Sequence, residues 1–280
     1  MAMGNGSMGK RQRGVAMSLD RERAWLDLGE CRPRNVVLSS MASSEYELLH
    51  PHLEPVDMPQ HFILFEQGER IPYVYFPCDG MVSLVVVAGD GRSVEVGIVG
   101  REGIVGTPCS VGVPQGPYRA ISQIAGQAAR LRAGTLANLL PTMPALRLGF
   151  SRYTLMQGLQ MAQVAACNRL HEIDQRLARW LLMCQDRVER GTLYLTHEFL
   201  AQMLGTGRPS VSLAIGMLED EGLIQNMRGA ISILDRAGLE TAACECYGVI
   251  RDFNQGLGLT SMPPQENAFA AEQTSASLPT

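Results

Sequence analysis

The residues whose types and spacing most clearly suggest a binding function lie in the stretch from Leu195 to Leu234. Arg208 carries a planar guanidinium that can donate two parallel hydrogen bonds to the edge of a guanine. Ser210 and Ser212 can donate hydrogen bonds to phosphate oxygens, and Leu213 can contact the methyl group of a thymine. These side chains could therefore read a DNA duplex, provided that one surface presents them together.

The surrounding sequence predicts two helices that would hold these residues in place. Thr196 is a favourable N-cap for a first helix, which begins at His197, and both are candidate DNA-binding residues, with a phosphate contact expected for His197. Gly205 suits a left-handed turn, and a second helix follows from Arg208, with Pro209 tolerated in its first turn. In this helix-turn-helix arrangement the second helix enters the major groove by its N-terminal end, so Arg208, Pro209, Ser210, Ser212 and Leu213 should face outward. The apolar positions expected to face inward are Phe199, Leu200, Met203, Leu204, Val211, Ile215 and Leu218.

A short β-hairpin is predicted directly after the second helix. Gly222 ends that helix, and residues 223–225 and 230–234 read as two strands. The tight turn over residues 226–229 places Arg228 at the tip, where it could contact a phosphate. A hairpin in this position is a wing, and it favours nucleic-acid binding over a packing unit of three helices.

Upstream, the chain alternates between short apolar runs and turn residues. The runs are rich in β-branched and aromatic residues, and no helical crossover separates them, so we expect an antiparallel barrel or sandwich and not a parallel α/β sheet. The predicted strands cover residues 62–65, 73–76, 81–87 and 94–99.

Residues 144–188 have a helical pattern with two apolar rows. One row contains Leu146, Phe150, Tyr153 and Gln157, and the other contains Leu155, Leu159, Ala162 and Ala166. A long helix with two such rows is expected to pack on the β-domain with one row and on a second helix with the other. That second helix could belong to another copy of the chain. The alternative is two shorter helices with a bend, the second within residues 172–182.

Composition limits the classes of function. The chain has 280 residues, 46% of them hydrophobic, and a net charge of −4, which excludes a protein coated in positive charge for indiscriminate nucleic-acid binding. No apolar run is long enough to span a bilayer, so no membrane partner is expected. The odd count of seven cysteines favours reduced thiols in a cytoplasm over a disulfide framework.

Two long stretches of the sequence resemble the Crp/Fnr type of bacterial transcription regulators. The run LTHEFLAQMLGTGRPSVSLAIGMLEDEGLI, followed by GAISILDRAGLE, resembles their winged helix-turn-helix, and EYELLHPHLEPVDMPQHFILFEQGERIPYVYFPCDGMVSLV resembles the opening of their cyclic-nucleotide-binding-type β-roll. The resemblance covers residues 36–249 and implies an α+β fold and a homodimer joined along the long helix. It also implies double-stranded DNA as a partner, with RNA polymerase as a further candidate.

The resemblance divides the chain into five segments. Where better-known members carry an acidic residue and a second arginine, this chain has Pro209 and Leu213, so its operator should differ from theirs. The expected segments are a disordered tail (1–35), the effector β-roll (36–140), the dimerisation helix (141–171), the winged helix-turn-helix (172–250) and a second disordered tail (251–280).

The effector is not identified by the sequence. In the resemblance, Glu102 aligns with the ribose-contacting carboxylate and Arg119 with the phosphate arginine of cyclic-nucleotide binders, while Gly103 lies in the glycine-rich loop. Ala120 replaces a residue with a hydroxyl group, and the loss of that donor costs on the order of 1–3 kcal/mol, which disfavours cyclic AMP. An effector, or none, would shift how the paired long helices place the two DNA-reading heads.

Other kinds of site find little support. Cys31 stands alone and Cys244 and Cys246 are separated by one residue, so we expect no metal site and no iron–sulfur signature, and no histidine is placed as a haem ligand. No Ser-His-Asp group, P-loop or HExxH motif is present, which argues against an enzyme, including a cupin-like one. The remaining alternative is a nucleotide-sensing module whose C-terminal head docks a protein partner.

Overall fold

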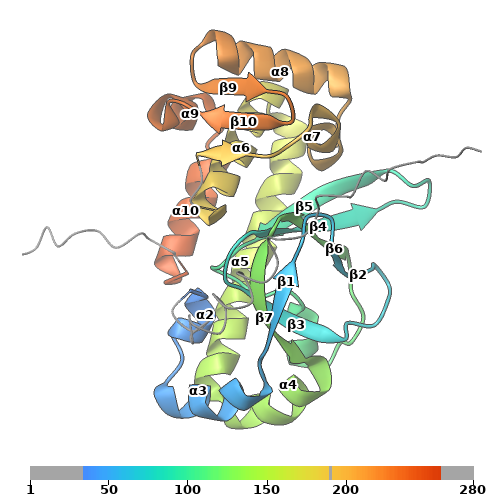
Figure 1. Ribbon diagram of the computed structural model, residues 1–280, viewed down its shortest axis with the longest axis vertical. Coiled ribbons are helices and arrows are strands. Elements are labelled where there is room, and N and C mark those ends of the chain that lie inside the picture. Colours follow the sequence, from blue (N-terminus) through green and yellow to red (C-terminus); the bar gives the residue numbers. More distant parts are fainter. Residues whose placement is uncertain (1–33, 189–190, 260–280) are drawn as a thin grey trace, which may run out of the picture. The chain divides into compact units, whose positions relative to one another are not determined.

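The computed structural model describes residues 34–188 and 191–259 (Figure 1). Its N-terminal part is an antiparallel β-roll of two sheets, with strand orders β1-β7-β3 and β2-β6-β4-β5. The strands are β1 (Glu54–Met58), β2 (Ile63–Phe65), β3 (Tyr73–Pro77), β4 (Met81–Val87), β5 (Ser93–Val99), β6 (Arg119–Ile124) and β7 (Gly126–Arg132).

The four strands expected from the apolar runs are therefore confirmed, together with the α+β fold class. Phe76, Leu84, Ile98 and Leu131, from both sheets, are fully buried and form the centre of the roll. Short helices complete it: α2 (Val36–Ser39), α3 (Ser43–Leu49), η1 (His50–His52), η2 (Thr107–Val111), α4 (Ala133–Leu139) and η3 (Leu140–Thr142).

The helical pattern over residues 144–188 forms two helices. Helix α5 spans Pro144–Leu170, and α6 spans Ile173–Val188. The break lies at His171, whose extended backbone (φ −116°, ψ 151°) ends α5, so the alternative with two helices describes the chain better than one continuous helix. The predicted inner row of α5 is buried: Leu146, Phe150, Tyr153 and Gln157.

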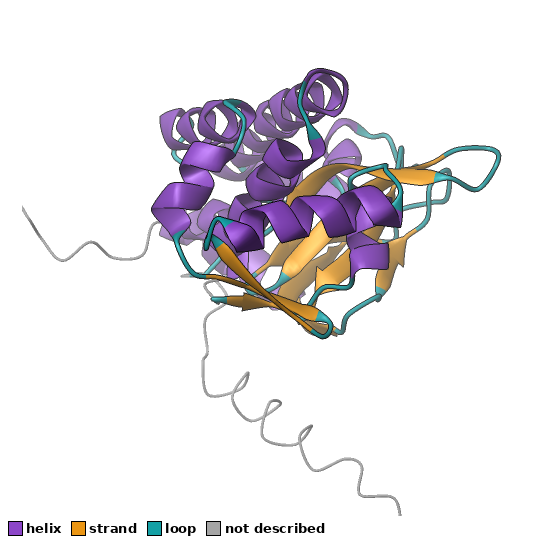
Figure 2. Cartoon of the chain, turned by 90° about the horizontal axis from the view of Figure 1, so that it is seen from above, coloured by secondary structure: helices purple, strands orange, loops and turns teal. Residues whose placement is uncertain are grey.

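The C-terminal part contains the predicted helix-turn-helix and wing. Figure 2 distinguishes the helices of the described residues from the strands by colour. A three-stranded sheet in the order β8-β10-β9 adjoins the helices. The elements are β8 (Thr192–Leu193), α7 (His197–Met203), α8 (Arg208–Asp220), β9 (Ile224–Met227), β10 (Ala230–Ile233), α9 (Arg236–Ala242) and α10 (Cys246–Gly256).

The described residues at the inner edges of both expected tails are folded. Helix α10 continues to Gly256 because Tyr247, Ile250 and the partly buried Phe253 form an apolar face that packs on the core, so the boundary at residue 251 is wrong. At the other end, Asn35 is buried, caps α2 and donates to the carbonyl oxygens of Pro77 and Gly103. Residues 1–33 and 260–280, where the tails were expected, lie outside the described residues.

Two buried polar contacts join the β-roll to α6. The indole nitrogen of Trp180 donates to Glu95 on β5 at 2.7 Å, and the hydroxyl of Ser83 donates to the same carboxylate. The guanidinium of Arg187 pairs with Glu102 at 2.8 Å, and both side chains are about 95% buried (5% and 6% exposed). Helix α6 is thus attached to the β-roll, and α8 and α9 of the C-terminal part also pack against it.

The cysteines only partly follow the expectation of reduced thiols. Cys109, Cys167, Cys184, Cys244 and Cys246 have free thiols. Cys78 is disulfide-bonded, so the expectation is wrong for this residue. Within the described ranges, none of the helices has the length and hydropathy that crossing a bilayer requires.

Candidate nucleic-acid interface

The turn between α7 and α8 fixes where the second helix begins. Gly205 adopts the predicted left-handed conformation (φ +59°), and an added Cβ there would also lie 3.0 Å from Val94 on β5. Gly207 then provides an extended N-cap, and α8 starts at Arg208 with Pro209 in its first turn. The sequence prediction of this turn and helix start is confirmed.

The first half of α8 presents the predicted residues to solvent. Arg208, Pro209, Ser210 and Ser212 are exposed, and Leu213 leaves 68% of its surface uncovered. The opposite face is buried, as the apolar spacing predicts, through Val211, Ala214, Ile215 and Leu218. An exposed leucine on the same helix as an exposed arginine suits contact with base edges more than contact with water.

Thr196 and His197, at the start of α7, both form hydrogen bonds within the C-terminal part. The hydroxyl of Thr196 caps α7 by accepting from the amide of Phe199 at 3.2 Å. The His197 ring contacts the hydroxyl of Ser212 through Nδ1 (3.0 Å) and the side-chain oxygen of Asn226 through Nε2 (3.2 Å). His197 therefore links α7, α8 and β9.

The turn of the wing lies one residue later than the predicted turn over residues 226–229. Ala230 pairs with Met227, which leaves Arg228 and Gly229 as the turn, and Gly229 takes a left-handed backbone (φ +75°). Arg228 is exposed at the tip. The wing is fastened to α8 because Glu219 accepts a hydrogen bond from the amide of Asn226 at 2.8 Å.

Charge is distributed unevenly along α8. Its first turn contains no acidic residue and begins with Arg208, so the positive end of the helix dipole and the guanidinium lie together. The acidic residues Glu219, Asp220 and Glu221 occupy the last turn and the C-cap. An approaching phosphate backbone would meet the positive end.

The residues aligned with an effector site fall into two separate pairs. Glu102 is buried, accepts from the amide of Gly100 at 3.1 Å and faces Arg187 of α6. Gly103 is packed so closely on α5 that an added Cβ would lie 2.2 Å from the ring of Tyr153. Both residues therefore form part of the joint between the roll and the helices.

The second pair, Arg119 and Ala120, begins strand β6. Arg119 forms an ion pair with Glu66 at 2.7 Å, with about a third of each side chain exposed, and Ala120 is fully buried. In the sheet register, Arg119 on β6 lies opposite Val85 on β4. Glu102 comes three residues after Val99, the last residue of β5, and Val99 lies opposite Val82 on β4. The strand register thus does not bring Glu102 and Arg119 together.

One group of residues was missed by the sequence prediction. The side chains of Cys167, His171, Cys244 and Cys246 meet at the end of α5. The spacing of Cys167 and His171, four residues apart on a helix, was the available signal, because it places both on one face. The residues at 244 and 246 come from a distant part of the chain, which no local pattern connects to that helix.

Comparisons with protein families identify two domains in the order that the structure shows. The model of the Crp-like helix-turn-helix domain matches residues 175–242, and the model of the cyclic nucleotide-binding domain matches residues 55–142. Among curated proteins, the sequence comparison finds no match.

Solved structures with the same fold are transcription regulators. FixK2 from Bradyrhizobium japonicum aligns with a TM-score of 0.60 and 16% identity, covering 69% of this chain and 98% of its own. A putative transcriptional regulator of the Crp/Fnr family from Eubacterium rectale has a TM-score of 0.59 and 17% identity, covering 74% of this chain and 96% of its own. The c-di-GMP responsive global regulator CLP of Xanthomonas campestris has a TM-score of 0.57 and 17% identity, covering 69% and 99%. With both domain models matched in this order, the chain has the domain pair and the fold of the Crp/Fnr type of regulators: a cyclic nucleotide-binding domain followed by a Crp-like helix-turn-helix domain.

Proposed function

We propose that the chain is a sequence-specific DNA-binding regulator and that α8 reads base pairs in the major groove. The observation that carries this proposal is the exposed first half of α8, where Arg208 and Leu213 stand on a helix whose opposite face is buried. The wing adds Arg228 beside it as a phosphate contact. Arg208 would donate to a guanine, Leu213 would contact a thymine methyl group, and Ser210 and Ser212 would position the helix.

Replacing Arg208 with alanine tests the base contact. A bidentate arginine–guanine contact is worth about 1–3 kcal/mol, so Arg208→Ala should weaken binding to the selected operator by roughly 5- to 150-fold. Binding to random DNA should change much less. The measurement is fluorescence anisotropy of labelled operator and scrambled duplexes at one salt concentration.

Arg228→Ala is the matched control, because a phosphate contact carries no base information. This variant should weaken binding to the operator and to the scrambled duplex by similar factors, and it should reduce the salt dependence of binding by about one phosphate contact. An equal loss on both duplexes for Arg208→Ala would contradict its role in base recognition.

The acting species is proposed to be a homodimer joined along α5. One side of this helix remains exposed and carries apolar or small residues at regular spacing: Leu148 (50% exposed), Leu155 (58% exposed), Gly158 and Ala162. This row shares Leu155 and Ala162 with the second row expected from the sequence, while Leu159 and Ala166 of the expected row are only partly exposed. A partner helix would cover the exposed row. Two heads related by a twofold axis would then meet half-sites about one DNA turn, roughly 34 Å, apart.

Leu155→Arg tests this interface. A charge in the middle of the row would be buried without a partner in the dimer, so the variant should sediment as a monomer at concentrations at which the wild type is a dimer. The control is Leu48→Arg, because Leu48 on α3 is equally exposed (57%) but lies outside the row. A variant that stays dimeric would place the interface elsewhere.

The β-roll is proposed to sense an effector other than cyclic AMP. The carboxylate of Glu102 is already held by Arg187, Arg119 is paired with Glu66, and Ala120 offers no hydroxyl. These residues do not supply the donors that a cyclic phosphate and a ribose need at one place. An effector bound to the roll would bias the position of the head through α6.

A further inference from the structure

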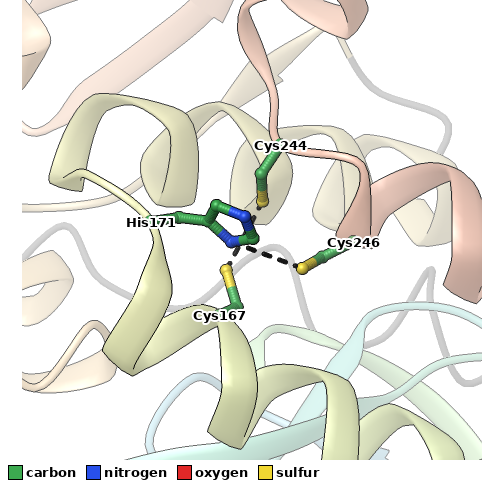
Figure 3. A group of neighbouring side chains, drawn as sticks. All are labelled: Cys167, His171, Cys244 and Cys246. Atoms are coloured by element: carbon green, nitrogen blue, oxygen red, sulfur yellow. Dashed lines mark hydrogen bonds between the residues drawn. The ribbon is translucent and has the colours of Figure 1, made fainter.

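Four side chains with metal-binding atoms converge where α5 ends (Figure 3). Cys167 lies in the last turn of α5, and His171 follows directly after it. Cys246 is the first residue of α10, and Cys244 lies two residues before it. The sulfur and nitrogen atoms all lie within 4.8 Å of one another, and the three cysteines are at most 5% exposed.

The spacing of these atoms fits one ion. The sulfur atoms of Cys167 and Cys244 are 3.4 Å apart, and the sulfur of Cys246 is 3.5 Å from Nδ1 of His171. In a tetrahedral zinc site with Zn–S bonds of about 2.3 Å and Zn–N bonds of about 2.0 Å, neighbouring ligand atoms lie about 3.5–3.8 Å apart. A cluster of several irons would hold its cysteines further apart, because they bind different metal atoms.

We propose that Cys167, His171, Cys244 and Cys246 bind a single zinc ion in a closed structural site. Three thiolates and one imidazole form a donor set that selects zinc among the common divalent ions. All four positions would be filled by the protein, so the ion would cross-link the chain and take no part in a reaction.

The surroundings of the ligands support the assignment. Nε2 of His171 contacts the carboxylate of Glu245 at 3.1 Å, which leaves Nδ1 as the atom that faces the sulfurs. A carboxylate behind a ligating histidine fixes its tautomer and orientation in many metal sites. The side-chain amide of Gln163 donates to the sulfur of Cys246 at 3.2 Å, as expected for a thiolate ligand.

The charge balance gives an independent argument. Arg176 and Arg179 are 9% and 3% exposed, and both interact electrostatically with Cys167. Among the described residues neither forms an ion pair with a carboxylate, and the Nε atoms of both lack a hydrogen-bond partner. Zinc bound by three thiolates and a neutral imidazole carries a net charge of −1, which supplies a buried anion beside these two guanidinium groups.

The position of the site indicates what the ion would do. His171 is the residue at which the backbone leaves α5, and α10 packs on α5 as well as on α6. An ion held by both α5 and the start of α10 would fix the angle between the dimerisation helix and the head. Zinc binding is inferred from these side chains alone and does not depend on DNA binding.

Metal analysis of the full-length protein tests the site. Protein purified without chelator and dialysed should contain one zinc per chain by plasma mass spectrometry. Reconstitution with Co²⁺ should give a thiolate-to-cobalt charge-transfer band and the d–d bands of tetrahedral coordination. Cys244→Ser should lose the zinc, whereas Cys109→Ser, which removes a buried free thiol outside the group, should keep it.

A second, milder variant tests the site even if Cys244→Ser does not fold. His171→Ala removes a partly exposed ligand (16% of the side chain) and should retain the charge-transfer band while its d–d bands shift. Folded wild-type protein without stoichiometric zinc, or with a Cys167–Cys244 disulfide under the same conditions, would overturn the proposal. Loss of zinc without loss of DNA affinity would leave the metal site standing and remove only its role in placing the head.

Discussion

Replacing Glu102 with alanine is expected to lower the free energy of unfolding by about 3–5 kcal/mol. Arg187 would then remain as a buried charge whose partner carboxylate is missing, since both side chains are almost completely enclosed. The amide of Gly100 would also lose its acceptor. Urea denaturation followed by tryptophan fluorescence measures the change.

A second ion pair of the β-roll provides the control. Glu66 and Arg119 are about one-third exposed, so Glu66→Ala should cost less than about 1 kcal/mol. If Glu102→Ala were as mild as Glu66→Ala, the joint between the β-roll and α6 would not depend on this buried pair. A preserved far-UV spectrum would show that the loss comes from the joint and not from collapse of the roll.

Protein stability is expected to fall as the pH rises from about 5 to about 8, because of Glu95. Complete burial raises the pKa of this carboxyl from 4.5 to about 7, against the hydrogen bonds from Ser83 and Trp180. The folded state therefore holds a proton that the unfolded chain releases above its ordinary pKa. Its stabilising contribution is present in full below pH 4.5 and is lost as the pH passes through 7. The change from this group amounts to about 3 kcal/mol.

Glu95→Gln separates this group from the rest of the titration. The amide keeps an oxygen for the Trp180 indole and a group that can bond the Ser83 hydroxyl, but it does not titrate. Thermal unfolding at several pH values should show a flatter profile for the variant and a crossing near neutrality, where it becomes the more stable protein. Parallel profiles for the two proteins would contradict the assignment.

Much of the architecture could be predicted because its signals are local. The β-branched run over Met81–Val87 forms β4 with those bounds, and Gly205 and Pro209 mark the turn and the start of α8. The wing followed from the polar turn around Arg228 between two short apolar runs. In each case a few neighbouring residues determine the backbone without help from distant ones.

What the sequence did not predict depends on contacts between distant residues. Cys167 and Cys244 are 77 positions apart, and Glu95 and Trp180 are 85 apart, so neither pair leaves a periodic signal. The spacing of Cys244 and Cys246 looks poor for a metal until α5 adds Cys167 and His171. The break between α5 and α6 was expected only as an alternative, since the helical pattern continues across His171.

The effector residues show the limit of a motif alignment. Glu102 matches a ligand-binding carboxylate by its place in the sequence, yet in the structure it belongs to the joint with α6. Glu95 and Glu102 both attach to α6, so this helix connects the β-roll with the C-terminal part of the chain. If the proposed function holds, Glu102→Ala and Glu95→Gln should alter regulation as well as stability.

Selection of genomic fragments by the full-length protein tests most directly whether the exposed start of α8 reads DNA. Binding of the enriched fragment is then titrated against salt. If α8 reads DNA, the enriched fragments should share an inverted repeat with half-site centres about one DNA turn apart. For six or more phosphate contacts, the affinity should fall roughly 10³-fold or more between about 50 and 200 mM salt. Fragments without a shared motif, or an affinity insensitive to salt, would contradict DNA reading by α8 and favour a head that docks a protein partner.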